Sequence, residues 1–128
     1  MSNRQTINTD KAPQVIGSYS QAIKSGTTVY ISGQIPLIAE TMELLRGSFR
    51  EKARLCFENL KSIAIAAGGT LDDTAKVTIF LTDMANFVEV NEVMAEFFKQ
   101  PYPARAAIGV RELPKGVPVE VEAILELK

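Results

Sequence analysis

Four segments of the chain carry the residue pattern of β-strands. Residues 27–32 alternate apolar and polar side chains and stop at Gly33, as a half-buried strand does. Residues 75–82 are rich in β-branched and aromatic side chains, which favours a buried strand. Two further strands are expected at 104–110 and 117–127, separated by the turn-rich sequence ELPKG.

The segment 48–67 has the period of an amphipathic helix, with apolar residues spaced by three and four and charged residues on the other side. Ser48 and Glu51 fit a capping box at its start, and Gly68-Gly69 supplies the left-handed residue that ends many helices. The apolar positions are Phe49, Ala53, Cys56, Phe57, Leu60, Ile63, Ala64 and Ala67.

A second helix is expected from about Phe87 to Lys99, with Asn86 and Glu89 as its capping box and Pro101 stopping it. Since no repeat or low-complexity tract interrupts the chain, residues 1–128 are expected to form one domain. Two long helices and several strands predict an α+β fold in which both helices pack on one face of a mixed β-sheet. The apolar face of the second helix comprises Phe87, Val90, Met94, Phe97 and Phe98.

Composition and charge narrow the classes of function. The chain is 46% hydrophobic and 23% charged, which is ordinary for a folded protein. Its formal net charge of -1 gives no basic excess to neutralise phosphates, so no nucleic-acid partner is expected. The polar N-terminus and the lack of any stretch of about 18 apolar residues argue against a signal peptide and a membrane span, which favours a cytoplasmic protein.

The absence of histidine and the single cysteine exclude further classes. Ser-His-Asp and Cys-His catalysis and histidine-ligated zinc all need imidazole, and one cysteine cannot build a thiolate metal site. Acid-base chemistry must therefore come from Asp, Glu, Lys, Arg or Tyr. Neither a metal ion nor an organic cofactor is expected, and Cys56, which has core spacing, is expected to pack without reacting.

Arg105 is the first candidate for chemistry. In PARAAIGV, strand alternation puts Arg105, Ala107 and Gly109 on one face, so two very small side chains beside the guanidinium leave room for a ligand. An arginine can donate two parallel hydrogen bonds to a carboxylate in one plane. The plainer interpretation is a surface salt bridge, because most strand arginines are solvated.

Two glutamates, Glu120 and Glu122, share one face of the last strand at positions roughly 7 Å apart. If that face is partly buried, repulsion and desolvation favour keeping a proton on one of them, which suits acid-base work or water activation. Spacing does not say which glutamate acts, and a solvated face is the alternative.

Asn91 and Tyr19 are further candidates. Asn91 falls in the apolar stripe of the second helix, so its amide is expected to be partly buried and to need partners, either by holding a loop or by contacting a ligand. Tyr19, in the run Gly-Ser-Tyr-Ser-Gln, either offers its ring for stacking over a pocket or is a core residue whose hydroxyl group reaches solvent.

Short motifs follow one another along nearly the whole chain: Ala12-Pro13, residues 17–22, 31–36, Asn59-Leu60, Ala67-Gly68, 77–81, 87–91, 102–107, 113–116 and 119–123. In this order they resemble the Rid family, the reactive-intermediate or imine deaminases also called YjgF-like proteins. PARAA, LPKG and VEVEA, at this chain length, are the specific part of the resemblance.

The resemblance implies a chorismate-mutase-like α+β fold assembled as a homotrimer, with three sites in clefts between adjacent subunits. It implies that Arg105 binds a substrate carboxylate and that Glu120 positions or activates water. The implied reaction is hydrolysis of 2-iminobutanoate or 2-iminopropanoate to a 2-oxo acid and ammonia. Water attack on an imine needs no metal, cofactor or imidazole, so the residues present suffice. The other pocket positions implied are Tyr19, Gly33, Asn91 and Ala107.

The chain departs from the family pattern at two places. Many relatives carry cysteine where this chain has Ala107, so a thiol role is excluded there. The loop after Pro36, LIAETMELL, lacks the Thr-Gly turn common in relatives. The resemblance therefore does not fix the shape of this loop or the substrate range.

Two other functions compete with deamination. A non-catalytic trimeric sensor of 2-oxo acids would use Arg105 but not Glu120. Ribonuclease or translation-inhibitor activity, claimed for members of the family, is disfavoured by the charge balance and the absence of histidine.

Overall fold

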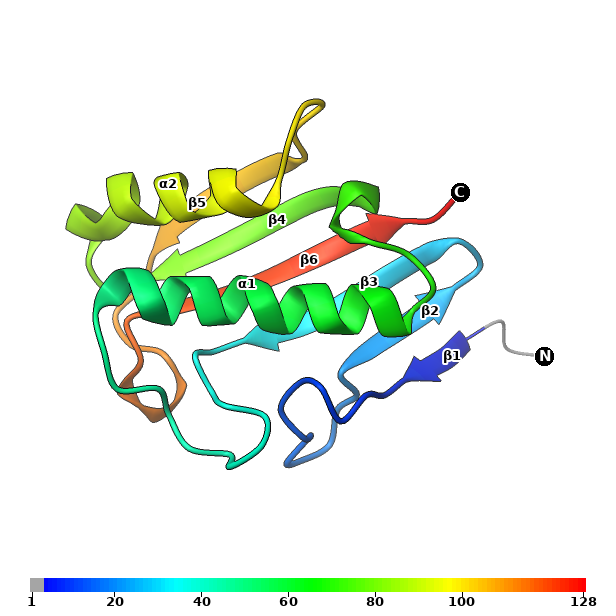
Figure 1. The fold of residues 1–128 in the computed structure, drawn as a ribbon, viewed down its shortest axis with the longest axis horizontal. Coiled ribbons are helices and arrows are strands. Elements are labelled where there is room, and N and C mark those ends of the chain that lie inside the picture. The colour runs from blue at the N-terminus through cyan, green and yellow to red at the C-terminus, as the bar shows by residue number, and fades with distance from the viewer. Residues whose placement is uncertain (1–3) are drawn as a thin grey trace.

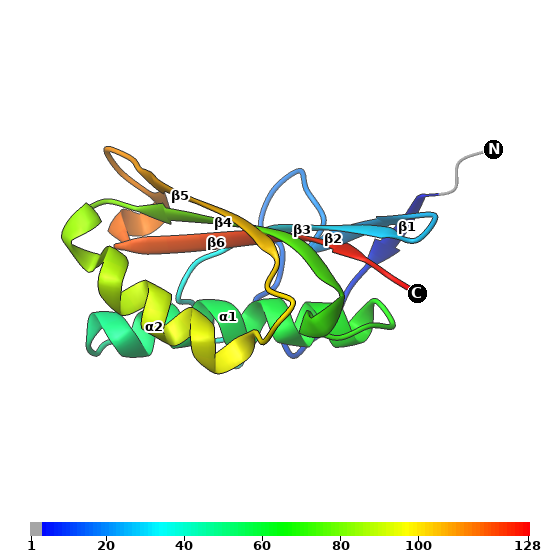
Figure 2. The same ribbon diagram turned by 90° about the horizontal axis from the view of Figure 1, so that it is seen from above.

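The structure is a computed structural model that describes residues 4–128, in which two helices cover one face of a six-stranded sheet (Figures 1 and 2). The strand order is β1-β2-β3-β6-β4-β5, and all neighbours are antiparallel except the parallel pair β4 and β5. The elements are β1 (Arg4–Ile7), β2 (Ala22–Ser25), β3 (Thr28–Gln34), α1 (Phe49–Ala66), β4 (Thr74–Leu81), α2 (Phe87–Phe97), β5 (Ala104–Gly109) and β6 (Val119–Glu126).

The hydrophobic core lies between the sheet and the two helices. Alternate residues of β4 and β6 point into it and are buried, as the period of a strand requires. The predicted apolar face of α1 is confirmed, because Phe57 and Leu60 are fully buried against the sheet. Along α2, Val90 and Met94 are buried, and Val93 joins them although it was not predicted.

The start of α1 agrees with the prediction in detail. The backbone N–H of Glu51 donates to Ser48 Oγ at 3.1 Å, and the backbone N–H of Ser48 donates to Glu51 Oε1 at 3.1 Å, which completes the capping box. Beyond the other end, Gly68 has a φ of +95°. A left-handed backbone of this kind is why glycine follows so many helices.

The start of α2 differs from the prediction. Asn86 makes no capping hydrogen bond through its side chain. A short 3-10 turn, Met84–Asn86, precedes the helix instead, and Asp83 Oδ1 accepts from the backbone N–H of Ala85 at 2.9 Å. The predicted capping box at Asn86 is therefore wrong, because the preceding turn already aligns the chain for the helix.

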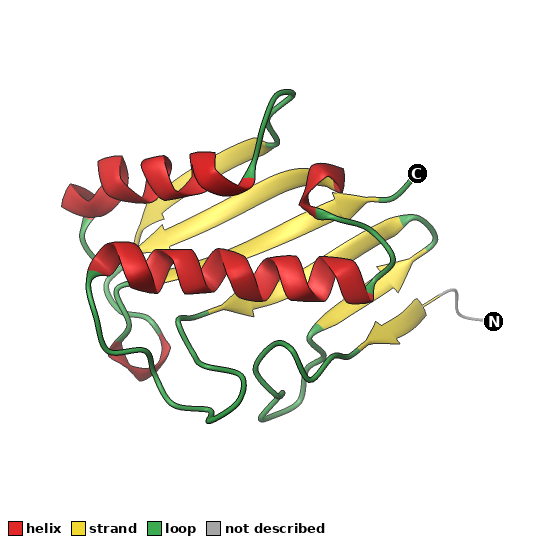
Figure 3. Ribbon diagram, in the orientation of Figure 1, coloured by secondary structure: helices red, strands yellow, loops and turns green. Residues whose placement is uncertain are grey.

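Neither α-helix of residues 4–128 lies on the opposite face of the sheet (Figure 2). Two large apolar side chains stand on it, Tyr30 at 52% and Ile108 at 43% exposure. Long loops gather at one end of the sheet, between β1 and β2 and between β3 and α1 (Figure 3). Neither helix of residues 4–128 has the length and hydropathy that crossing a bilayer requires.

Candidate functional site

Arg105 lies on edge strand β5 and points to the face of the sheet that the helices cover. Its register partner in β4 is the fully buried Val77, and paired residues leave a sheet on the same side. The guanidinium is still exposed, because β5 is the outermost strand of the sheet that residues 4–128 form. Ala107, partly buried, follows on the same face beside Ile79, so the predicted alternation along this strand is confirmed.

Two residues of α2 orient the Arg105 guanidinium. Its Nη1 donates a hydrogen bond to Asn91 Oδ1, and its Cζ lies 5.1 Å from the centroid of the Phe87 ring, within reach of a cation–π contact. No ion pair involves Arg105 within residues 4–128. The salt-bridge interpretation therefore finds no support inside one chain.

Asn91 corrects an expectation, because it is exposed rather than partly buried. Its position on α2 overhangs the sheet edge, where it meets Arg105 instead of the core. Both side chains line a cavity of about 480 Å³ together with Met94, Tyr102 and Pro103. We call this the Arg105 cavity.

Glu120 lies on β6 and points to the open face of the sheet. Its register partner is Phe80, whose neighbours Ile79 and Leu81 face the core, so Glu120 leaves the side opposite to Arg105. Its side chain is half-buried, whereas Glu122 on the same face is exposed. Burial, and secondarily the charge of Glu122, raise the pKa of Glu120 above its ordinary value. The partly buried face that acid-base work requires is confirmed.

Gly33 allows Glu120 its position. The pairing of β3 with β6 slips between Ile31 and Gln34, and this irregularity brings the Gly33 backbone against the glutamate. A Cβ at Gly33 would lie 2.9 Å from Glu120 Cδ, closer than such atoms approach in proteins. Only glycine fits here without moving the carboxylate.

Tyr19, Gly33 and Glu120 line a cavity of about 690 Å³ on the open side of the sheet. Tyr19 belongs to the loop before β2, which rises on that side (Figure 2), and it is 54% exposed. Tyr19 therefore lines a cavity and is not a core residue. The lining also includes Glu122, Lys115 and the apolar side chains Val15, Ile16, Ile35, Leu37 and Met42. We call this the Glu120 cavity.

Two buried amides hold the loops of the Glu120 cavity, and sequence reasoning assigned neither a role. Gln21 Nε2 donates to the Pro13 carbonyl at 2.8 Å and to the Thr9 carbonyl at 3.0 Å. Asn59 Nδ2 donates to the Leu37 carbonyl at 3.1 Å. The sequence did contain a sign of the role of Asn59, because its amide lies in the apolar stripe of α1 and a buried amide needs hydrogen-bond partners.

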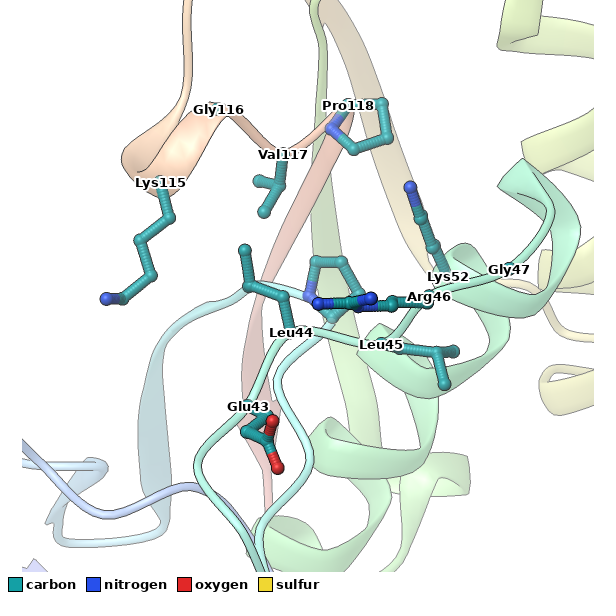
Figure 4. A pocket seen from close by; sticks show the side chains of 11 residues that line it. Glu43, Leu44, Leu45, Arg46, Gly47, Lys52, Lys115, Gly116, Val117 and Pro118 are labelled. Atoms are coloured by element: carbon teal, nitrogen blue, oxygen red, sulfur yellow. The ribbon is translucent and has the colours of Figure 1, made fainter.

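A third cavity, of about 550 Å³, lies between the loop before α1 and the turn before β6 (Figure 4). It carries the cations Arg46, Lys52 and Lys115 and none of the predicted site residues. Figure 4 shows the Lys115 ammonium pointing away from the Arg46 guanidinium, so these charges do not converge on one ligand.

The structure does not bring Arg105 and Glu120 together. Arg105 and Asn91 line one cavity, while Tyr19, Gly33 and Glu120 line another that opens on the opposite face of the sheet. Ala107 lines neither. A small ligand held within one chain therefore contacts either the guanidinium or the carboxylate. Residues 4–128 also contain no group of three or more Cys, Asp or Glu side chains that could hold a metal ion.

Replacing Gly33 with alanine is expected to leave the fold intact and to lower any activity that depends on Glu120 by about tenfold to a hundredfold, because a displacement near 1 Å costs that much. The three atoms nearest to the new methyl group all belong to the Glu120 side chain, which can turn away without moving the backbone. Steady-state rates and melting temperatures would check this. Gly47→Ala, which crowds Glu51 in the capping box of α1 and not Glu120, is the control. Unchanged activity in Gly33→Ala would contradict the role given to this close approach.

Known proteins resemble the chain over nearly its full length. The sequence profile of the family described as Endoribonuclease L-PSP matches residues 9–127. A 2-iminobutanoate/2-iminopropanoate deaminase of Dermatophagoides farinae is 44% identical over 128 residues and covers all of both chains.

Solved structures agree with this match. RidA from an Antarctic Psychrobacter species is 54% identical, with a TM-score of 0.92 over 96% of this chain and 99% of that one. Escherichia coli TdcF with bound serine is 40% identical, with a TM-score of 0.91 over 97% of this chain and 99% of that one. The expected α+β fold, with two helices on one face of a mixed sheet, is confirmed.

Proposed function

The chain belongs to the Endoribonuclease L-PSP family, also called the YjgF/Rid family, and from this premise we propose that it hydrolyses 2-imino acids to 2-oxo acids and ammonia. Family membership and the name of the Dermatophagoides relative support reactive-intermediate deamination. The substrates proposed are 2-iminobutanoate and 2-iminopropanoate. We also propose that residues 1–128 form one Rid-like domain that works in the cytoplasm as a homotrimer, without a cofactor.

The separation of Arg105 from Glu120 is the observation that carries this proposal. Each lines its own cavity, and the two open on opposite faces of one sheet. A cyclic homotrimer would set the Arg105 cavity of one subunit beside the Glu120 cavity of the next. The uncovered sheet face, with Tyr30 and Ile108 exposed, supports such an assembly because a contact between copies would bury these side chains.

In the proposed mechanism Arg105 binds the carboxylate of the imino acid, with Asn91 and Phe87 holding the guanidinium in place. Glu120 orients a water molecule toward the imine carbon, accepts one of its protons as the new C–O bond forms, and passes that proton to the imine nitrogen, which gives the carbinolamine. In the second step Glu120 accepts the proton of the carbinolamine hydroxyl and donates it to the nitrogen. The hydroxyl oxygen then forms the new carbonyl, the C–N bond breaks and ammonia leaves.

The raised pKa of Glu120 suits this sequence of steps. A carboxyl whose pKa lies nearer to neutrality is a better proton acceptor for water and a better donor to the departing nitrogen than an ordinary surface glutamate. Imines also hydrolyse without a catalyst, so orientation and modest acid-base assistance are enough to explain a site without specialised groups.

Ammonia release tests the function directly. Threonine dehydratase would generate 2-iminobutanoate in solution, with and without the purified chain, and ammonia would be followed over time. We expect faster release with the chain present. Binding of 2-oxobutanoate without faster ammonia release would favour the sensor instead. RNA degradation that persists in Arg105→Ala and follows a contaminant through column fractions would remove the ribonuclease alternative.

Glu122→Gln is expected to move the acid limb of the pH–rate profile to lower pH. Glu120 acts as a carboxylate, so activity falls as pH drops through its pKa. The Glu122 charge helps to raise that pKa, and removing the charge lowers it, although the effect of burial remains. The profile of kcat/KM against pH would show the shift. Glu112→Gln, at an exposed position outside both cavities, should leave the profile in place.

A further inference from the structure

Met42 has an unusual backbone for its residue type. Its φ is 61°, and only one other non-glycine residue among 4–128, Lys115, lies in the left-handed region. Side chains of L-residues crowd the backbone there, so glycine or asparagine is the ordinary choice. A long side chain kept in this conformation suggests that the side chain itself is used, since such outliers gather at functional sites.

The loop that carries Met42 is closed by its own hydrogen bonds. The backbone N–H of Met42 donates to the Ile38 carbonyl at 2.7 Å, and that of Ile38 donates to the Glu43 carbonyl at 2.9 Å. Leu37 and Leu44 form an isolated bridge at its base. The loop therefore has a defined shape that fixes the direction of the Met42 side chain.

That side chain lines the Glu120 cavity. Apolar side chains from two loops form the same lining, Val15 and Ile16 from the loop before β2 and Ile35 and Leu37 from the segment after β3. In one chain this cavity has a volume of about 690 Å³. Met42 is half-buried in it, and an unbranched thioether adapts to apolar groups of different shape.

Resting on the deaminase function proposed above, we propose that Met42 determines substrate specificity. Its side chain contacts the side chain of the bound 2-imino acid and favours long apolar groups, such as those of imines derived from leucine, over the methyl group of 2-iminopropanoate. The physical cause is the removal of apolar surface from water on both partners, which a methyl group supplies only in part. Glu120 and Arg105 act on the imine and the carboxylate, which all 2-imino acids share.

The test compares two imines with three variants. An amino acid oxidase, with catalase present, would generate the imines of leucine and alanine, and ammonia release would give kcat/KM for each. We expect Met42→Gly and Met42→Asn to lower the leucine-to-alanine ratio by about tenfold, the usual value of an apolar contact in a pocket. Met42→Leu keeps an apolar side chain and should stay within about twofold of the wild-type ratio.

The asparagine variant separates the effect of side-chain contact from that of loop mobility. Asparagine tolerates the left-handed backbone at position 42, whereas glycine would also make the loop more flexible. A ratio that falls in the glycine variant alone would overturn the proposal. So would wild-type ratios in both variants, and the deaminase function would then still stand, because the wild-type chain releases ammonia. If the wild-type chain accelerates release from neither imine, both proposals are overturned.

Discussion

Replacing Arg105 with alanine is expected to lower kcat/KM for 2-iminobutanoate by about a hundredfold to a thousandfold, because the substrate carboxylate would lose its charged partner. Nothing else among the lining residues of the Arg105 cavity carries a positive charge. Asn91 would retain its amide but cannot supply the planar pair of donors. The ammonia-release assay measures the loss.

The fold should tolerate this change, since the guanidinium is exposed and its described partners, Asn91 and Phe87, stay in place on α2. Arg105→Lys keeps the positive charge but lacks the two parallel hydrogen-bond donors of the guanidinium, so it should retain only part of the wild-type rate. Arg111→Ala removes an exposed arginine outside both cavities and serves as the matched control. Equal losses in Arg105→Ala and Arg111→Ala would remove Arg105 from the mechanism.

Replacing Glu120 with glutamine is expected to reduce kcat by about a hundredfold or more while 2-oxobutanoate binding changes little, because the amide cannot accept a proton from water. Glutamine has nearly the same size, so Gly33 and the surrounding cavity need not move. Rates with dehydratase-generated imine, and titration calorimetry with 2-oxobutanoate, would separate catalysis from binding. Full activity in Glu120→Gln with a large loss in Glu122→Gln would assign the water to Glu122.

Unfolding cannot explain the loss in Glu120→Gln. Burial raises the pKa of Glu120, so the folded state disfavours the carboxylate. The stability that the protonated form contributes is fully present below the unfolded pKa and is lost as pH rises through the raised folded pKa. The glutamine variant avoids this loss, so near neutral pH it should be at least as stable as the wild type.

The elements that sequence predicted well are those whose own residues suffice to define them. In α1, helical spacing, the Ser48–Glu51 capping box and Gly68 all lie within one segment, and the structure reproduces each. Strands β1 and β2 escaped prediction because they are short, and β1 lies at the exposed edge of the sheet. Their structure comes from pairing with neighbours rather than from a pattern of their own.

The site was predictable residue by residue but not as an arrangement. Strand alternation correctly gave the neighbours of Arg105 on its own strand and put Glu120 and Glu122 together. Which face each strand presents to the helices depends on the register of β5 and β6 against β4, a long-range property. For this reason the placement of the two groups on opposite sides of the sheet could not be inferred from either strand alone.

Asn91 shows that the residue pattern of a helix, like that of a strand, does not reveal how the element is placed against its neighbours. Its place in the apolar stripe of α2 predicted partial burial, and that was wrong because α2 lies over the edge strand β5 (Figure 1). A helix in that place has one flank over solvent, so its apolar stripe is wider than the surface it buries. The contact with Arg105 arises from this overhang.

We propose that a complete site needs Arg105 from one subunit and Glu120 from its neighbour. The Arg105→Ala chain and the Glu120→Gln chain would each be produced alone, and the two would also be produced together in equal amounts so that mixed trimers form. Ammonia release would be measured for the two single variants and for the mixture. Each variant alone should be nearly inactive. Random mixing in a trimer leaves both groups intact at about one quarter of the sites, so about a quarter of wild-type activity should return. A mixture no more active than the separate variants would contradict the claim.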